Sequence, residues 1–371
     1  MKPIRILHEN VIMDQGGIEN LLMNIYRNVD REKVQFDFIV HREQKGCFED
    51  EITEMGGKIY RTPPFNPFHY NAYASAVEKV YRDHPEYKIV HCHSELNLWP
   101  LKIAEKCGIP VRIAHSHNTK CRFSLKTFFF YYEKMFIKKY CTHMFMCSEP
   151  AGEWSFGRKA VEENRCRLVK NGIVVPNFTF NETTRERIRH ELGIENKIVI
   201  GHVGKFMAQK NHEFLIKLFE YIHKENSSTV LMLIGGGELE EKIKTMVHDY
   251  SLDDSVMFMG TRKNVNDYMQ AMDVFVLPSA WEGLGLVNIE AQAAGLPAVV
   301  SDEVPEEAVV TDLITRLPLS EPYEVWSREI LKRADTVRRD TSEEIFKSGY
   351  DIVRTAKQLE DFYYSFRGLY D

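Results

Sequence analysis

Apolar runs of strand length alternate with amphipathic runs of helical length along most of the chain. The first of the strand-like runs are Ile4–His8, Phe36–Val40, Ile89–His93, Val111–His115 and Met144–Cys147. Such alternation favours parallel sheets covered by helices. The pattern pauses over the polar stretch between Asn171 and Lys197 and then restarts, which predicts two such sheets in one α/β protein.

Composition and charge limit the possible functions. The chain has 371 residues, 44% of them hydrophobic and 27% charged, which is enough for two domains. A net charge of −6 argues against a nucleic-acid-binding protein. Seven cysteines without a C-x-x-C pair indicate free thiols in a reducing compartment. The start does not resemble a signal peptide and no apolar run approaches ~18 residues, so we expect a cytoplasmic protein.

The stretch EGLGLVNIE, residues 282–290, combines a glycine loop with the start of a helix. A helix that opens in this way exposes backbone N–H groups that have no partner within the helix, and these groups bind anions. We expect the loop to hold a negatively charged ligand and the carboxylates at its two ends to bind neutral parts of that ligand. The residues concerned are Glu282, Gly283, Leu284, Gly285, Leu286 and Glu290.

Two further motifs follow predicted strands, where ligands bind in parallel sheets. Gly16 and Gly17 carry no side chain and would let a backbone approach a ligand, although a tight turn without a ligand explains them equally well. Gly204 precedes Lys205 and Lys210, which are suited to phosphate. Two solvated lysines are the alternative, but the second anion-type loop in the same predicted domain favours phosphate.

Histidines recur at the ends of two predicted strands, as the pairs His91 with His93 and His115 with His117. Residues i and i+2 of a strand face the same side, so each pair presents both rings in one direction. A zinc site, a hydrogen-bonded core and a polar wall that contacts a sugar are the three interpretations. We favour the polar wall, because carboxylates or thiolates at ligand spacing are missing nearby.

These motifs together resemble glycosyltransferase family 4. The resemblance rests on E-x7-E over Glu282 and Glu290, on the G-K-x4-K motif that ends at Lys210, on the early Gly-Gly pair and on Asn171-Gly-Ile. It implies a GT-B fold, with two Rossmann-like domains whose parallel sheets face a central cleft. Residues 1–175 would bind the acceptor, 176–345 the nucleotide sugar, and 346–371 would form a helix that crosses back. Lys205 departs from the arginine usual in the family.

The resemblance also implies retaining, metal-independent transfer from a nucleotide diphosphate sugar, with a UDP-sugar favoured over a GDP-sugar, and no cofactor. The acceptor would be a glycan or a lipid-linked glycan of surface polysaccharide synthesis. The implied catalytic residues are His117, Lys205, Lys210 and Glu282; the implied substrate-binding residues are Gly16, Gly17, His115, Gly204, Gly283, Leu284, Gly285, Leu286 and Glu290. A nucleotide-sugar 2-epimerase and a catalytically silent sensor of sugar nucleotides are the alternatives.

A basic and aromatic segment, KCRFSLKTFFFYYEKMFIKKY, occupies residues 120–140. It contains six basic residues and one acidic residue, with eight aromatic residues between them. A core-facing helix with a solvated basic face would explain the pattern. The local excess of positive charge beside loose aromatic residues also suits an anionic membrane surface. We therefore expect peripheral attachment to the inner face of the cell membrane.

Overall fold

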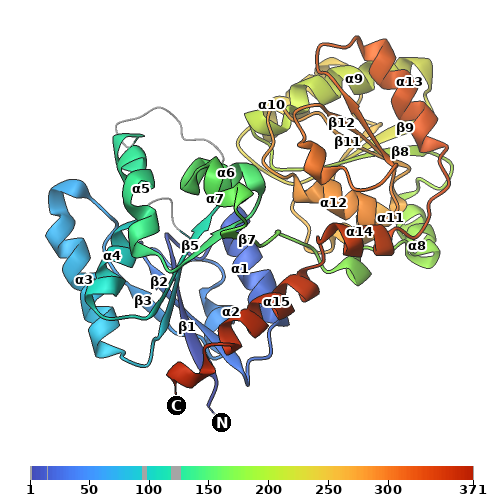
Figure 1. Ribbon diagram of the computed structural model, residues 1–371. Coiled ribbons are helices and arrows are strands. Elements are labelled where there is room, and N and C mark those ends of the chain that lie inside the picture. The colour runs from blue at the N-terminus through green and yellow to red at the C-terminus, as the bar shows by residue number, and fades with distance from the viewer. Residues whose placement is uncertain (1, 15, 94–97, 118–126, 371) are drawn as a thin grey trace. The chain divides into compact units, whose positions relative to one another are not determined.

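The computed structural model describes residues 2–14, 16–93, 98–117 and 127–370. The chain forms two compact units (Figure 1): residues 1–172 together with 352–371, and residues 173–351. Each unit is an α/β domain built on one parallel sheet. No helix in the described part of the chain is both long and apolar enough to cross a membrane.

The first unit contains a seven-stranded sheet in the order β3-β2-β1-β4-β5-β6-β7. Its strands are β1 Ile4–Asn10, β2 Val34–Val40, β3 Ile59–Arg61, β4 Ile89–Cys92, β5 Val111–Ser116, β6 His143–Met146 and β7 Cys166–Leu168. All neighbouring strands are parallel. The five strands predicted in this part of the sequence are confirmed, with bounds that differ by one or two residues.

Helices cover both faces of this sheet. They are α1 Gly17–Asn28, α2 Glu49–Glu54, α3 Tyr70–Asp83, α4 Leu98–Lys106, α5 Thr127–Tyr140, α6 Glu149–Phe156, α7 Arg158–Glu162 and α15 Ile352–Tyr364. Apolar side chains of α3, α4 and α5 pack with Leu7, Val90 and Ala114 on one face. On the other face, beneath α1 and α15, His8 and His91 lie among apolar side chains of those two helices.

The end of the chain differs from the single helix expected over 346–371. Helix α14, Ser342–Ser348, belongs to the second unit and ends at Gly349, whose φ of 82° is left-handed. Asp351 then pairs with Ile173 in a parallel bridge. Only from Ile352 does the chain return to the first unit, where α15 packs along α1 (Figure 1).

The second unit contains a six-stranded sheet in the order β10-β9-β8-β11-β12-β13. Its strands are β8 Ile198–Val203, β9 Thr229–Ile234, β10 Val256–Phe258, β11 Val274–Leu277, β12 Ala298–Ser301 and β13 Ile314–Leu317. The remaining helices are α8 Glu182–Leu192, α9 His212–Glu225, α10 Glu240–Asp249, α11 Val265–Ala271, α12 Leu286–Ala293 and α13 Tyr323–Ala334. Two apolar clusters, one on each side of this sheet's strands, form the core.

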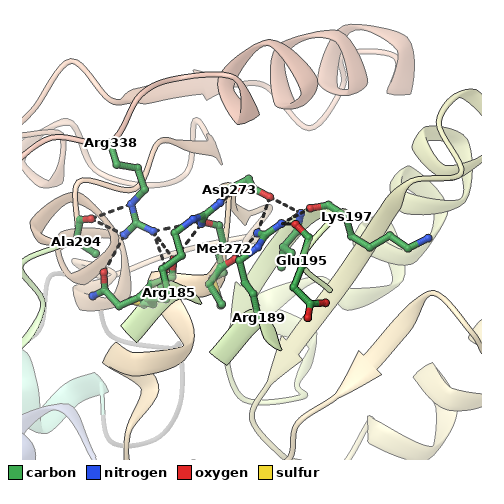
Figure 2. A network of polar contacts seen from close by, with 12 residues as sticks. Arg185, Arg189, Glu195, Lys197, Met272, Asp273, Ala294 and Arg338 are labelled. Atoms are coloured by element: carbon green, nitrogen blue, oxygen red, sulfur yellow. Dashed lines mark hydrogen bonds and ion pairs between the residues drawn. The ribbon is translucent and has the colours of Figure 1, made fainter. Parts of the chain in front are cut away.

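Helix α8 occupies most of residues 181–197, the polar part of the pause in the sequence pattern. Its N-cap residue, Asn181, accepts a hydrogen bond from the Thr184 N–H at 2.8 Å. Arg185 and Arg189 fasten this helix to the unit, because both form ion pairs with Asp273 (Figure 2). Two arginine side chains thus hold α8 in place together with Ile188 and Leu192, which pack in the core cluster.

Arg338 closes the ends of two other helices in the same network (Figure 2). Its guanidinium donates to the carbonyls of Met269 at 3.0 Å and Gln270 at 2.9 Å, in the last turn of α11, and to Ala294 O at the end of α12. Burial, followed by the charge of Arg185, lowers the pKa of Arg338 to about 9, so the group stays charged at neutral pH. One side chain thus satisfies the C-terminal carbonyls of two helices.

Replacing Arg338 with alanine removes this donor from the Met269 and Ala294 carbonyls, while Gln270 O keeps its bond from Arg185. We expect Arg338→Ala to lower the free energy of unfolding by about 3 kcal/mol, measured by urea denaturation. The control is Arg339→Ala, since the Arg339 side chain is 41% exposed and forms surface ion pairs with Asp312 and Glu344. That variant should lose less than about 1 kcal/mol. Equal losses would contradict the capping role.

Candidate active site

A nearly buried ion pair joins the loops that follow β8 and β11. The ammonium of Lys210 lies 2.6 Å from the carboxylate of Glu282, and their side chains are 14% and 7% exposed. Glu282 also accepts hydrogen bonds from Ser279 Oγ at 2.9 Å and from Gln209 Nε2 at 3.2 Å. The sequence assigned Lys210 to phosphate and Glu282 to sugar hydroxyls, and the structure places the two side chains in contact.

The glycine loop leads into α12 as the sequence predicts. Gly285 is the N-cap residue of this helix and has a φ of 68°, which side-chain-bearing residues rarely adopt. No side chain caps the helix, and the Asn288 N–H bonds Gly285 O at 2.7 Å. A Cβ at Gly283 would meet open space, whereas Leu284 and Leu286 pack partly against the core. The loop therefore presents backbone groups at the start of a helix.

In the loop that follows β8, residue 204 has little room for a side chain, which explains the glycine there. A Cβ there would lie 2.9 Å from His202 Nε2 and 3.1 Å from Lys210 Cγ. Lys205 is exposed and forms no ion pair with any residue that the structure describes. Of the two predicted lysines, only Lys210 is held in a fixed position by a partner.

Two histidines beside this loop escaped the sequence reasoning. His202 Nδ1 donates to Val276 O at 2.8 Å, so its Nε2 is an acceptor, and that atom has no partner within the described residues. His212 is 2% exposed and stacks on Phe206, and neither ring nitrogen has a described partner. The sequence offered one indication that His212 belongs to the site, namely its position directly after Lys210 and Asn211. Burial lowers the pKa of His212 to about 4, so it is a neutral donor beside Lys210.

Glu290 lies on α12, one turn beyond the glycine loop. Burial raises the pKa of its carboxyl to about 7, and the charge of Lys210 opposes that shift. The carboxylate makes no hydrogen bond with another described residue. It is therefore a desolvated acceptor near Lys210 and is chemically suited to a ligand hydroxyl.

The predicted glycines of the first unit lie at the start of α1. Gly16 is the N-cap residue, and a Cβ on it would lie 2.2 Å from Glu19 Oε2. Glu19 in turn accepts a hydrogen bond from Asn10 Nδ2 at 3.0 Å, at the end of β1. A Cβ at Gly17 would meet nothing within 4 Å. The Glu19 side chain could move away from such a Cβ, so space does not explain Gly16, and ligand binding by either glycine stays a prediction.

The strand-end histidines of the first unit gather into one cluster with His8. Ring nitrogens lie 3.0 Å apart in His8 and His93, 3.1 Å in His93 and His117, and 3.2 Å in His91 and His115. His115 is 1% exposed, whereas His117 is only partly buried. Two trios offer nitrogens within 4.8 Å of one another, and three histidines can hold a catalytic zinc ion. The nitrogens of successive rings lie 3.0 to 3.2 Å apart, which is hydrogen-bond distance, so we interpret the set as a hydrogen-bonded cluster.

Two α/β domains, each built on one parallel sheet, form the architecture of the GT-B class, and the second carries the lysine–glutamate pair beside the start of α12. Residues 15–175 match the model of Glycosyltransferase Family 4, and residues 184–332 match that of Glycosyl transferases group 1. EpsF of Bacillus subtilis (strain 168) is 33% identical over 372 residues, which cover 97% of this chain and 96% of EpsF. The chain belongs to the family 4 glycosyltransferases.

Other similar proteins agree with this assignment. The Escherichia coli protein named UDP-Gal:alpha-D-GlcNAc-diphosphoundecaprenol alpha-1,3-galactosyltransferase is 30% identical over 227 residues, 58% of each chain. The crystal structure of Anabaena HepE in complex with UDP and glucose has a TM-score of 0.73 at 17% identity and covers 98% of this chain and 100% of that one. The fold is GT-B and the protein is a hexosyltransferase.

The raised pKa of Glu290 has a consequence for stability. The carboxyl has a pKa of about 7 in the folded chain and 4.5 in the unfolded chain. At pH values between these two, the folded chain keeps the proton and the unfolded chain has lost it. The free energy of unfolding should therefore fall by about 2 to 3 kcal/mol between pH 4.5 and pH 7.5 because of this group.

Glu290→Gln should remove that part of the pH dependence, which urea denaturation at both pH values measures. Glu303→Gln, an exposed residue after β12, is the matched control and should keep the wild-type slope. If the Glu290→Gln slope equals that of the control, Glu290 is not desolvated as described.

Proposed function

We propose that this glycosyltransferase transfers a hexose from a UDP-sugar to a glycan or lipid-linked acceptor of surface polysaccharide synthesis, with retention and without a metal ion. The observation that carries the proposal is the Lys210–Glu282 pair beside the start of α12 and Glu290. A sugar nucleotide offers hydroxyl groups at both ends and negative charge between them. The arrangement of carboxylates around cationic and N–H groups matches that distribution.

The transition state places growing negative charge on the diphosphate leaving group. Lys210 and the free N–H groups at the start of α12 would stabilise that charge, with exposed Lys205 as a second cation. Glu282 holds the Lys210 ammonium in place before the ligand arrives, so little reorganisation is needed. The sequence has no D-x-D motif of metal-binding type. Retention and metal independence are otherwise supported by membership of the family.

The two carboxylates would bind opposite ends of the donor. Glu290 would accept hydrogen bonds from ribose hydroxyls, and Glu282, already paired with Lys210, from a hydroxyl of the transferred sugar. His117, at the end of β5, would contact the sugar near the reacting centre. Gly16 and Gly17 would approach the donor from the first unit.

The comparisons support the choice of substrates. HepE was crystallised with UDP, and the E. coli relative is named for a UDP-Gal donor and a diphosphoundecaprenol-linked acceptor. We therefore favour uridine over guanosine in the donor and a lipid-linked sugar as acceptor. The role in surface polysaccharide synthesis rests on the resemblance of the sequence motifs to glycosyltransferase family 4.

Incubation with a panel of nucleotide sugars and lipid-linked acceptors tests the reaction. We expect UDP release that depends on acceptor and that continues in excess EDTA. An epimerised sugar nucleotide would identify an epimerase instead, and binding without turnover would identify a sensor. Loss of transfer in EDTA, restored by a divalent ion, would contradict metal independence.

Lys210→Met removes the charge while keeping most of the side-chain volume, and we expect kcat to fall about 100-fold. The change also leaves Glu282 charged and nearly buried without its partner, which costs stability. The double variant Lys210→Met/Glu282→Gln should regain stability but not turnover. Lys217→Met, an exposed residue of α9, is the control and should keep wild-type kcat. Near-wild-type turnover in Lys210→Met would refute the phosphate role.

We also propose that α5 attaches the enzyme to an anionic membrane surface. Tyr131 and Met135, one helical turn apart, are 58% and 73% exposed. Lys138 and Lys139 at the end of this helix are exposed as well, although the ammonium of Lys138 also bonds Phe156 O at 3.0 Å. The first seven residues of the basic segment, 120–126, lie outside the described residues. Exposed aromatic and basic side chains on one helix suit the headgroup region.

Vesicle flotation tests this attachment. We expect the wild type to float with anionic vesicles at low salt and to be released by high salt, because charge contributes to binding. Tyr131→Ser/Met135→Ser should lower the floating fraction. Val337→Ser is the control, since Val337 is 86% exposed but belongs to the second unit. Equal recovery of all variants in the soluble fraction would contradict the proposal.

A further inference from the structure

The histidines of the first unit form two hydrogen-bonded rows. In the His8 row, His8 Nδ1 lies 3.0 Å from His93 Nε2, and His93 Nδ1 lies 3.1 Å from His117 Nε2. In the Tyr363 row, the Tyr363 hydroxyl lies 2.6 Å from His91 Nδ1, and His91 Nε2 lies 3.2 Å from His115 Nδ1. Both rows start beneath α1 and α15 and end at the carboxyl end of β5.

Strand register creates the rows. His8 of β1 and His91 of β4 are paired residues on neighbouring parallel strands, so their side chains lie on the same face of the sheet. His93 and His117 each lie two residues beyond a histidine of β4 or β5, so both lie past the strand ends and on the same side as that histidine, and both belong to the His8 row. The rings of His91 and His93 stack with centroids 4.1 Å apart, and those of His115 and His117 are tilted by 35° with centroids 4.0 Å apart.

All five imidazoles are neutral. Burial lowers the pKa of His8 and of His117 to about 3, and it lowers that of His91, His93 and His115 well below the ordinary value. A neutral imidazole carries one hydrogen, so each ring donates from one nitrogen and accepts at the other. Each row must therefore run in one of two directions.

The buried end decides the direction of the His8 row. His8 is 1% exposed, and its Nε2 has no hydrogen-bond partner within the described residues. Its surroundings are Leu21, Ile25 and Phe36, so that nitrogen meets apolar groups. A buried N–H without an acceptor is rarer in proteins than a buried acceptor without a donor. His8 Nε2 is therefore unprotonated, and His8 Nδ1 carries the hydrogen and donates it to His93 Nε2.

The rest of the row follows from this. His93 accepts at Nε2, so its hydrogen is on Nδ1 and is donated to His117 Nε2.

We propose that His8 and His93 are positioning residues that fix His117 as the tautomer with its hydrogen on Nδ1. His117 thus offers a neutral N–H, and the ligand atom it meets is an acceptor oxygen of the sugar diphosphate. This inference rests on the proposed function for the identity of the ligand. His117 is then a hydrogen-bond donor through Nδ1. His8 and His93, which are buried, act by holding His117 in this tautomer.

The tautomer can be read directly. Long-range ¹H–¹⁵N spectra of the protein labelled at histidine distinguish protonated from bare ring nitrogens, and His117→Asn assigns the signals of His117. We expect His117 Nδ1 to be protonated and Nε2 bare at neutral pH, with and without UDP. The opposite assignment overturns the proposal, as does one zinc ion per purified chain whose removal changes the histidine signals.

Removing the row's middle member tests the positioning role. His93→Phe keeps an aromatic ring but leaves His117 Nε2 without a donor, so His117 should show both tautomers. We expect kcat to fall about threefold to tenfold while the affinity for UDP is unchanged. His143→Phe, on β6 outside both rows, is the control and should keep both the tautomer and kcat. An unchanged His117 tautomer in His93→Phe would refute the proposal.

The two proposals fail separately. The spectra require no turnover, so a wild type that shows the expected tautomer but transfers no sugar overturns only the proposed function. Active enzyme with its hydrogen on His117 Nε2 overturns only the positioning role. If His93→Phe does not fold, as its thermal unfolding would reveal, the wild-type tautomer and the His8→Phe variant still decide the question.

Discussion

The Lys210–Glu282 ion pair is the interaction on which the second unit's site depends. It joins two loops that are 72 residues apart in the sequence and that follow different strands. A nearly buried pair is stable only while both charges are present, so each loop is fixed by the other. Ser279 and Gln209 direct the carboxylate, and Ala280 N–H bonds Gln209 O at 2.8 Å, so backbone as well as side chains tie the loops together. The start of α12 is thereby positioned before any ligand binds.

In the first unit, hydrogen bonds between imidazoles rather than an ion pair join the ends of neighbouring strands. Its strand ends carry imidazoles that burial keeps neutral, and their mutual hydrogen bonds replace the ion pair as the ordering contacts. A cationic group in this apolar place would require a buried counter-ion, which neither row contains. The contacts that order the two sites therefore differ: an ion pair joins two loops of the second unit, whereas imidazole hydrogen bonds join β1, β4 and β5 of the first.

Sequence patterns predicted the regular elements well because periodicity reflects burial, as for β8, α9 and α12. They missed α8, whose contacts run through Arg185 and Arg189 to Asp273 and which therefore carries no strong apolar stripe. The motifs located Lys210, Glu282 and the glycine loop, but not the pairing of the two side chains, since spacing along a chain does not give distance in space. His8 was missed for the same reason: strand register, not sequence, brings it to His93.

The return of α15 to the first unit makes the second unit an insertion between two parts of one domain. Arg367 and Tyr370, near one end of the chain, bond the carbonyls of Lys2 and Arg5 near the other. During synthesis the second unit has all its strands and helices as soon as residue 351 leaves the ribosome. The first unit, although made earlier, lacks the part of the cover over His8 and Phe36 that α15 supplies until residues 352–371 emerge. The domain begun first is thus completed last, and its apolar sheet face stays exposed for the time that the other needs to be translated.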